Sequence, residues 1–160
     1  MTFRVLPIEP DVLDELRKLD DAGREVSVRI EDAKDGAPLR CCLRRAQPGE
    51  RIALVSYAPL RRWAREAGAN PGAYDEVGPV FIHADSCDGP ASPEWPEELR
   101  GSRRVLRAYS KDGHILGGCL LDRNTELSER TAEDLLLDPE IALLHVRAVE
   151  FGCFFFEVRR

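Results

Sequence analysis

The side chains best suited to chemistry lie near the end of the chain, where His145, Glu157 and Cys153 are close in sequence. Two apolar, alternating segments predict a β-hairpin over residues 141–159. In this hairpin His145 lies opposite Glu157, and Cys153 lies near the turn. A carboxylate orients a neighbouring imidazole and favours its charged form, so these residues are candidates for general acid–base catalysis or for binding a metal. An exposed sheet face on which His145 and Glu157 simply pair is the alternative.

The register of this hairpin follows from its apolar side chains. A three-residue loop that ends at Gly152 aligns Val146 with Phe156 and brings both apolar rows onto one face. It also places Gly152 at the loop position that needs a left-handed backbone. On the polar face, Arg147 is then expected opposite Phe155, beside the His145–Glu157 pair.

A second pair of candidates, His83 and Cys87, lies at the end of a predicted strand and in the loop after it. Together with His145 and Cys153 they would supply a tetrahedral nitrogen and sulfur set for zinc, provided that the last hairpin lies beside that strand end. Cys87 with His83, or Cys153 with His145, could instead form a nucleophilic pair. Partly buried Cys and His without special chemistry are more common, so we expect neither a metal nor a cofactor.

The five cysteines do not predict disulfides, because their number is odd and the N-terminus lacks the pattern of an export signal. We therefore expect free thiols. Cys41 and Cys42 are adjacent in a predicted strand and would point to opposite faces of it. No CxxC pair occurs, so the sequence favours neither a zinc knuckle nor a thioredoxin-type redox motif.

Arg107 is a candidate anion-binding residue in a predicted hairpin whose turn contains Asp112-Gly113. A two-residue turn places Arg107 opposite Gly118, which has no side chain and so leaves room for a ligand or for close backbone approach. Tyr109 lies on the same face as Arg107 and could help to bind an anion. A β-bulge at 117–118 with a solvated arginine is the alternative.

The remaining pattern predicts an α+β fold made mainly of antiparallel hairpins with two or three short helices. Helical spacing of apolar residues, or a proline that opens a turn, favours helices over 11–19, 60–67 and 126–137 and a helical turn over 96–99. Strands are expected over 3–6, 25–30, 40–46, 51–57, 78–83, 103–109, 114–121, 141–149 and 153–158. The turn 47–50 should join 40–46 to 51–57 as a hairpin.

Length and composition are those of one ordinary globular domain over residues 1–160, with 43% hydrophobic and 32% charged residues. A net charge of −6 gives no general attraction to nucleic acid or to anionic membranes, so we expect neither as a partner. No apolar run approaches the roughly 20 residues of a membrane-spanning helix. We therefore expect a cytoplasmic protein.

The chain resembles a bacterial family of uncharacterised proteins known only as domain of unknown function 1203. The resemblance covers about residues 40 to 156 and rests on short segments in a fixed order, at 46–51, 56–57, 78–83, 106–109, 112–113, 144–145 and 152–154. No established activity comes with this family, so the resemblance implies no catalytic roles. It does draw attention to His83, His145 and Cys153, which lie in or beside these segments.

These patterns together predict a domain that binds or processes a small anionic molecule. The expected pocket is lined by Arg107, Tyr57, Arg147, His83, His145 and Cys153, with Glu157 beside His145. The alternative is a non-catalytic interaction module or a homodimer that uses a sheet face or edge. In that case His145, Glu157 and Arg147 should lie on an open, flat surface. Whether the protein is an enzyme is left open.

Overall fold

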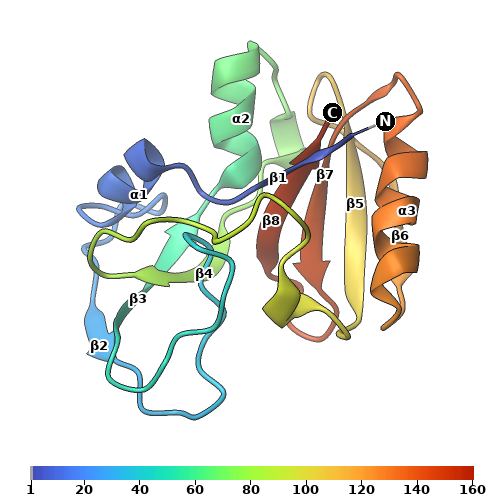
Figure 1. Ribbon diagram of the computed structural model, residues 1–160. Helices are drawn as coiled ribbons and strands as arrows, with labels where there is room; N and C mark the ends of the chain where they lie inside the picture. The colour runs from blue at the N-terminus through green and yellow to red at the C-terminus, as the bar shows by residue number, and fades with distance from the viewer. Residues whose placement is uncertain (1) are drawn as a thin grey trace.

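The structure, a computed structural model, contains two antiparallel sheets and confirms the α+β prediction (Figure 1). It describes residues 2–160, apart from the side chains of Leu99 and Thr125. The larger sheet has the strand order β1-β8-β7-β5-β6, and the smaller sheet has the order β2-β3-β4. The strands are β1 (Arg4–Leu6), β2 (Val28–Ile30), β3 (Arg51–Tyr57), β4 (Gly78–His83), β5 (Arg104–Ser110), β6 (Ile115–Leu121), β7 (Ile141–Ala148) and β8 (Phe154–Arg159).

Three short α-helices, α1 (Pro10–Leu16), α2 (Pro59–Ala67) and α3 (Thr125–Leu136), cover parts of these sheets. The first two begin with a proline, which suits the first helical position because its missing N–H would have no partner there. The Asn124 side chain caps α3 by accepting a hydrogen bond from the backbone of Leu127. Among the described residues, no helix combines the length and apolar character needed to cross a membrane.

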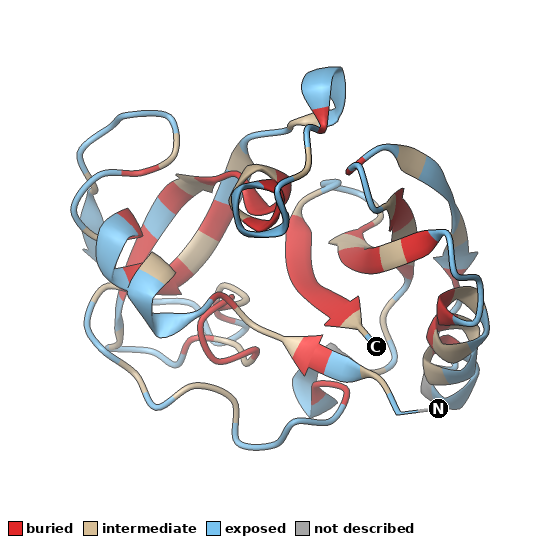
Figure 2. Cartoon of the chain, turned by 90° about the horizontal axis from the view of Figure 1, so that it is seen from above, coloured by how far each residue is buried: buried red, intermediate tan, exposed pale blue. Residues whose placement is uncertain are grey.

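Buried residues form three clusters, and the strands that carry the candidate site are among the most buried parts of the chain (Figure 2). The first cluster lies between the five-stranded sheet and α3. The second packs α1 and the segment 39–46 against the three-stranded sheet, and Phe154 of β8 joins it. The third is centred on α2 and Tyr109. The ends of β3 and β4 therefore lie close to β7 and β8.

The β7–β8 hairpin has most of its predicted register and one deviation. Leu144 pairs with Val158, and His145 pairs with Glu157, as expected. After Val146 the register shifts, so Arg147 lies opposite Phe154 and not Phe155, and the connection runs from 149 to 153. The predicted three-residue loop is therefore wrong. Gly152, with φ of 70°, has the left-handed backbone that was expected of it.

This β-bulge has a physical reason in the packing of two neighbouring phenylalanines. Phe155 lies in the cluster of the five-stranded sheet, where its ring is 4.5 Å from the Arg40 guanidinium and 4.4 Å from that of Arg104. Phe154 lies on the other side, 5.0 Å from the His145 ring. Successive residues of a regular strand point to opposite faces, yet Phe155 and Phe156 lie in the same cluster. The extra residue in β8 lets these two be buried on one side while Phe154 is buried on the other.

The β5–β6 hairpin confirms that Arg107 lies opposite Gly118 and contains a bulge nearby. A Cβ atom on Gly118 would lie 2.3 Å from the carbonyl oxygen of Leu106. The predicted close backbone approach is therefore present. The register shift falls between Ala108 and Tyr109, one residue away from the bulge that the sequence suggested.

The predicted strand 40–46 is wrong, because this segment forms a compact turn. Leu39 donates a backbone hydrogen bond to Arg44, and Leu43 donates one to Leu39, so the segment closes on itself. Both edges of β3 are already occupied, by β2 and β4, and no place remains for a further strand. The turn at 47–50 does form, through a hydrogen bond from Glu50 to Gln47. Strand β2 is shorter than the predicted 25–30.

Candidate functional site

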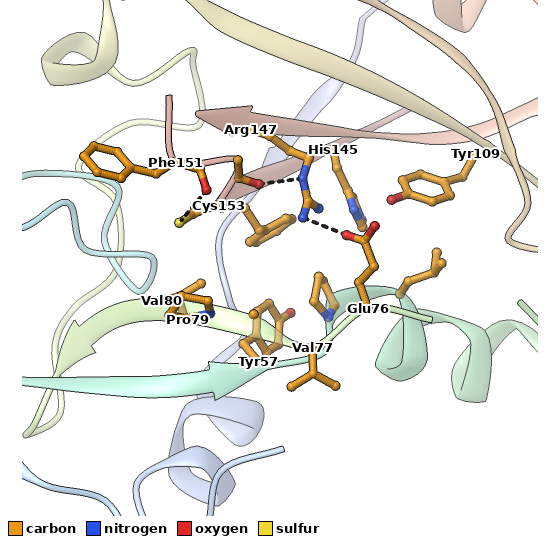
Figure 3. A pocket seen from close by; sticks show the side chains of 15 residues that line it. Tyr57, Glu76, Val77, Pro79, Val80, Tyr109, His145, Arg147, Phe151 and Cys153 are labelled. Atoms are coloured by element: carbon orange, nitrogen blue, oxygen red, sulfur yellow. Dashed lines mark hydrogen bonds and ion pairs between the residues drawn. The ribbon is translucent and has the colours of Figure 1, made fainter. Parts of the chain in front are cut away.

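A small pocket of about 90 Å³ lies where the two sheets meet and contains most of the predicted ligand-binding residues (Figure 3). Tyr57 comes from the end of β3, His145 and Arg147 come from β7, and Cys153 comes from the β7–β8 connection. Tyr109 of β5 and Glu76, which precedes β4, complete the polar part of its wall. The fold thus brings together four candidates that are far apart in sequence.

His145 is fully buried, and it is oriented by Glu157 as the register predicted. Its Nε2 atom lies 3.3 Å from Oε2 of Glu157, and its ring lies 4.7 Å from the ring of Tyr109. Nδ1 has no hydrogen-bond partner among the described residues. Since His145 and Glu157 are both buried, the predicted open, flat surface is not what the structure contains.

The charges of this pair follow from its burial. Burial lowers the pKa of His145 below its usual value, although Glu157 acts in the opposite direction. Burial would raise the pKa of Glu157, but the hydrogen bond from His145 and the charge of Arg159 outweigh it and lower that pKa. A neutral imidazole that donates from Nε2 to a carboxylate keeps a lone pair on Nδ1, which can accept a proton or a hydrogen bond.

Arg107 and Arg147 are close together, as an anion site would require, but both bind a carboxylate of the chain itself. Arg147 Nη2 lies 2.9 Å from Oε2 of Glu76, and Arg107 Nη1 lies 2.9 Å from Oε1 of the same side chain. Figure 3 shows Glu76 extending toward Arg147. Arg147 also donates to the carbonyl oxygen of Gly152. The two predicted anion ligands therefore share one carboxylate of the chain, which compensates one of their two positive charges.

A second, larger groove of about 610 Å³ borders the small pocket and shares Pro79, Phe151 and Cys153 with it. Its walls contain five arginines and one acidic residue, Glu150. The arginines are Arg40, Arg45, Arg103, Arg104 and Arg123. Burial lowers the pKa of Arg40 to about 10, and burial together with the charge of Arg45 lowers that of Arg104. The groove therefore contains an excess of positive charge.

His83, which the sequence placed in the same pocket as His145, lies elsewhere, at the end of β4. There its Nδ1 atom is 3.3 Å from Sγ of Cys41 and 3.7 Å from Sγ of Cys42. Cys87 belongs to the same group, in which all four ligand atoms lie within 4.8 Å of one another. His145 and Cys153 are not part of this group, so the predicted four-residue set is divided between two places.

Neither predicted nucleophilic pair is joined by a hydrogen bond within the described chain. The Cys153 thiol donates weakly to the carbonyl oxygen of Phe151, 3.7 Å away. The thiols that approach His83 directly are those of Cys41 and Cys42. The Cys41 thiol also donates a hydrogen bond to the sulfur of Cys42. This hydrogen bond raises the pKa of Cys41 and lowers that of Cys42.

Sequence reasoning missed Glu76, the pairing of Cys41 with Cys42, and the five-arginine groove. Glu76 lies in a segment with no regular pattern, and nothing in the sequence indicates its contact with two distant strands. The sequence predicts a strand for the two cysteines, and adjacent side chains of a strand point to opposite faces. The clustering of arginine over 40–45 and over 100–107 was a usable signal for the groove, because both segments contribute arginines to its walls.

Comparison with known proteins agrees with the resemblance seen in the sequence. A family model described as Protein of unknown function (DUF1203) matches residues 36–160. The chain belongs to this family. The matched range contains the whole pocket, the groove and the cysteine–histidine group, whereas β1, α1 and β2 lie before it. No curated protein and no solved structure gave a significant match.

Proposed function

We propose that this cytosolic protein of a bacterial family binds a small anionic molecule in the five-arginine groove. The observation that carries the proposal is the concentration of Arg40, Arg45, Arg103, Arg104 and Arg123 in one groove of about 610 Å³. Ligand pockets commonly measure about 300–1,000 Å³, so the groove is large enough for a metabolite. The adjoining pocket of about 90 Å³ has room for only a few atoms.

The charges of the groove favour an anion. Arg40 and Arg104 are buried, and both guanidinium groups lie over the Phe155 ring, 4.5 and 4.4 Å from its centre. Arg104 Nε has no hydrogen-bond partner among the described residues. Burial and mutual repulsion both disfavour these charged arginines, and a bound carboxylate or phosphate would relieve both. Guanidinium groups bind such planar or multidentate anions well.

The walls of the groove also indicate an apolar part in the ligand. Leu54 is 51% exposed and Phe151 is 86% exposed, although both are large and hydrophobic. A ligand that carries an anionic group at the arginines and an apolar portion over these side chains would cover both. Cys153 and His145 lie toward the small pocket, where Nδ1 of His145 could accept a proton from the bound molecule if it is processed.

The alternative of a non-catalytic interaction module has less support. It predicts an open, flat surface at His145, Glu157 and Arg147, whereas the first two side chains are buried. β6, one of the two edge strands of the larger sheet, exposes Leu116 and Leu120, so a homodimer through a sheet edge stays a prediction. Measuring the oligomeric state of the protein in solution tests this prediction.

The proposal is tested by anion binding to the purified protein, with pyrophosphate and citrate as probes. We expect either probe to raise the melting temperature beyond the effect of sodium chloride at equal ionic strength. A double variant, Arg103→Gln with Arg123→Gln, should weaken binding at least about tenfold, because each lost charge-assisted hydrogen bond contributes about 1.5–3 kcal/mol. Both residues are exposed, so the variant should fold.

Arg130→Gln, on the exposed face of α3, is the control for a lost surface arginine, because Arg130 lies outside the groove. Glu150→Gln should strengthen binding by removing the one acidic side chain of the groove. The proposal is wrong if neither probe acts beyond the salt control, or if Arg130→Gln weakens binding as much as the double variant does.

A further inference from the structure

We propose that Cys41, Cys42, His83 and Cys87 form a zinc site. The side chains come from three separate places: the turn 40–45, the end of β4 and the loop after it. Their ligand atoms all lie within 4.8 Å of one another. This inference does not depend on the proposed anion binding, since the groove and this group share no lining or ligand residue.

The distances fit the edges of a zinc tetrahedron. With Zn–S bonds of about 2.3 Å and Zn–N bonds of about 2.0–2.1 Å, neighbouring ligand atoms are about 3.5–3.8 Å apart. Here Cys41 Sγ lies 3.9 Å from Cys42 Sγ, and His83 Nδ1 lies 3.3 and 3.7 Å from these two sulfurs. Three thiol ligands and one imidazole select zinc over calcium or magnesium, which prefer oxygen ligands.

An unusual backbone conformation brings the adjacent cysteines together. Leu43 has φ of 57° and is the one non-glycine residue of the described chain with positive φ. Such a conformation is unfavourable for a bulky residue and persists where the surrounding contacts enforce it. It closes the turn through the hydrogen bond from Leu43 to Leu39, so that Cys41 and Cys42 point toward His83 together.

The histidine is held in the orientation that a metal ligand needs. Its Nε2 atom lies 3.3 Å from Oε1 of Glu50, so that Nδ1 faces the sulfurs. Arg44 fixes Glu50 with two hydrogen bonds of 2.6 and 3.0 Å, and its Nη2 atom is also 3.4 Å from His83 Nε2. A carboxylate that accepts a hydrogen bond from the remote nitrogen of a histidine is a common feature of zinc sites.

The loop that carries Cys87 is held in place as well. Arg17, which directly follows α1, donates to the carbonyl oxygens of His83 and Asp85 over 3.1 and 2.8 Å. Cys87 itself is only partly buried and borders an open depression of about 410 Å³, which gives a metal ion access from solvent. Because four protein ligands complete the tetrahedron, the zinc would fasten the turn and the loop to β4 and not act on a substrate.

The test is the metal content of the full chain purified under reducing conditions without a chelator, measured by elemental analysis. We expect about one zinc per chain. Cys42→Ser should lose most of it, whereas the matched control Cys119→Ser, on β6 and outside the group, should keep it. Because Cys42→Ser could fail to fold, cobalt(II) is also added to the metal-free wild type, and a sulfur-to-cobalt charge-transfer absorption is expected.

The inference is overturned if the reduced wild type contains no zinc and the metal-free protein binds neither zinc nor cobalt. It is also overturned if mass spectrometry of the protein as purified finds a Cys41–Cys42 disulfide that persists when zinc is supplied under reducing conditions. Equal metal loss in Cys42→Ser and Cys119→Ser would likewise contradict it, because the ion would then be bound elsewhere.

Discussion

Nε2 of His145 lies 3.3 Å from Oε2 of Glu157, and both side chains are buried. A buried charge needs partners, and Glu157 has a second one in Arg159, whose Nε donates to the other carboxylate oxygen. The pair therefore joins β7 to β8 through side chains as well as through the backbone, and His145 also lines the small pocket.

Glu157→Gln should destabilise the protein by about 1–3 kcal/mol. The amide keeps the shape of the side chain and can still accept from His145, but it removes the negative charge that Arg159 and the imidazole share. The free energy of unfolding, measured with urea, checks this. Glu126→Gln, on the exposed side of α3, should change it by less than about 0.5 kcal/mol. Equal effects of the two substitutions would contradict the role given to the pair.

The stability of the protein should fall as the pH is lowered from 6.5 toward 5. The pKa of His145 in the folded protein lies below the ordinary value of 6.5, chiefly because of burial. Below pH 6.5 the unfolded chain therefore binds a proton that the folded chain does not, which favours unfolding. This one-proton difference gives a slope of at most about 1.4 kcal/mol per pH unit. Charged groups around the imidazole are Glu157, Arg147 and Arg107.

His145→Gln should flatten this dependence, while His114→Gln, at an exposed turn, should keep it. The imidazole of the wild type can also be titrated directly by NMR, which avoids the need for a stable variant. Carboxylates with a lowered pKa, such as Glu50 with a pKa of about 2, change the stability in a lower pH range, below their ordinary pKa of 4.5. A His145 resonance that titrates above pH 6.5 would contradict the prediction.

The β7–β8 hairpin was largely predictable because its register depends on local alternation. Burying both apolar rows on one face permits only one alignment, and His145 therefore had to lie opposite Glu157. The bulge was not predictable, because it depends on Arg40 and Arg104, which reach Phe155 from distant segments. Alternation describes one strand and its neighbour and contains no information about such contacts.

The segment 40–46 was mispredicted for a related reason. Its residues have the composition of a strand, but β3 already has two neighbours, and Arg40 is drawn inward to donate to the carbonyl oxygen of Phe154 over 2.7 Å. The consequence for the site was large. A strand separates Cys41 from Cys42, whereas the turn directs both toward His83, so the group that could hold a metal differs from the predicted one.

Gly118→Ala should destabilise the protein by about 1–3 kcal/mol, the typical effect of overpacking. The added Cβ would lie 2.3 Å from the carbonyl oxygen of Leu106 in the same hairpin, and a backbone oxygen can move away only if β5 and β6 separate locally. Arg107, the pairing partner of Gly118, would move with them and weaken its ion pair with Glu76. Urea unfolding and the position of the melting curve measure the loss.

Gly78→Ala is the matched control, because a Cβ on Gly78 meets no atom within 4 Å and its backbone does not require glycine. It should change the free energy of unfolding by less than about 0.5 kcal/mol, the usual range for substitutions without a clash. If Gly118→Ala is as well tolerated as Gly78→Ala, then β6 is not held against β5 as closely as the Leu106 contact implies, and Gly118 serves no steric purpose there.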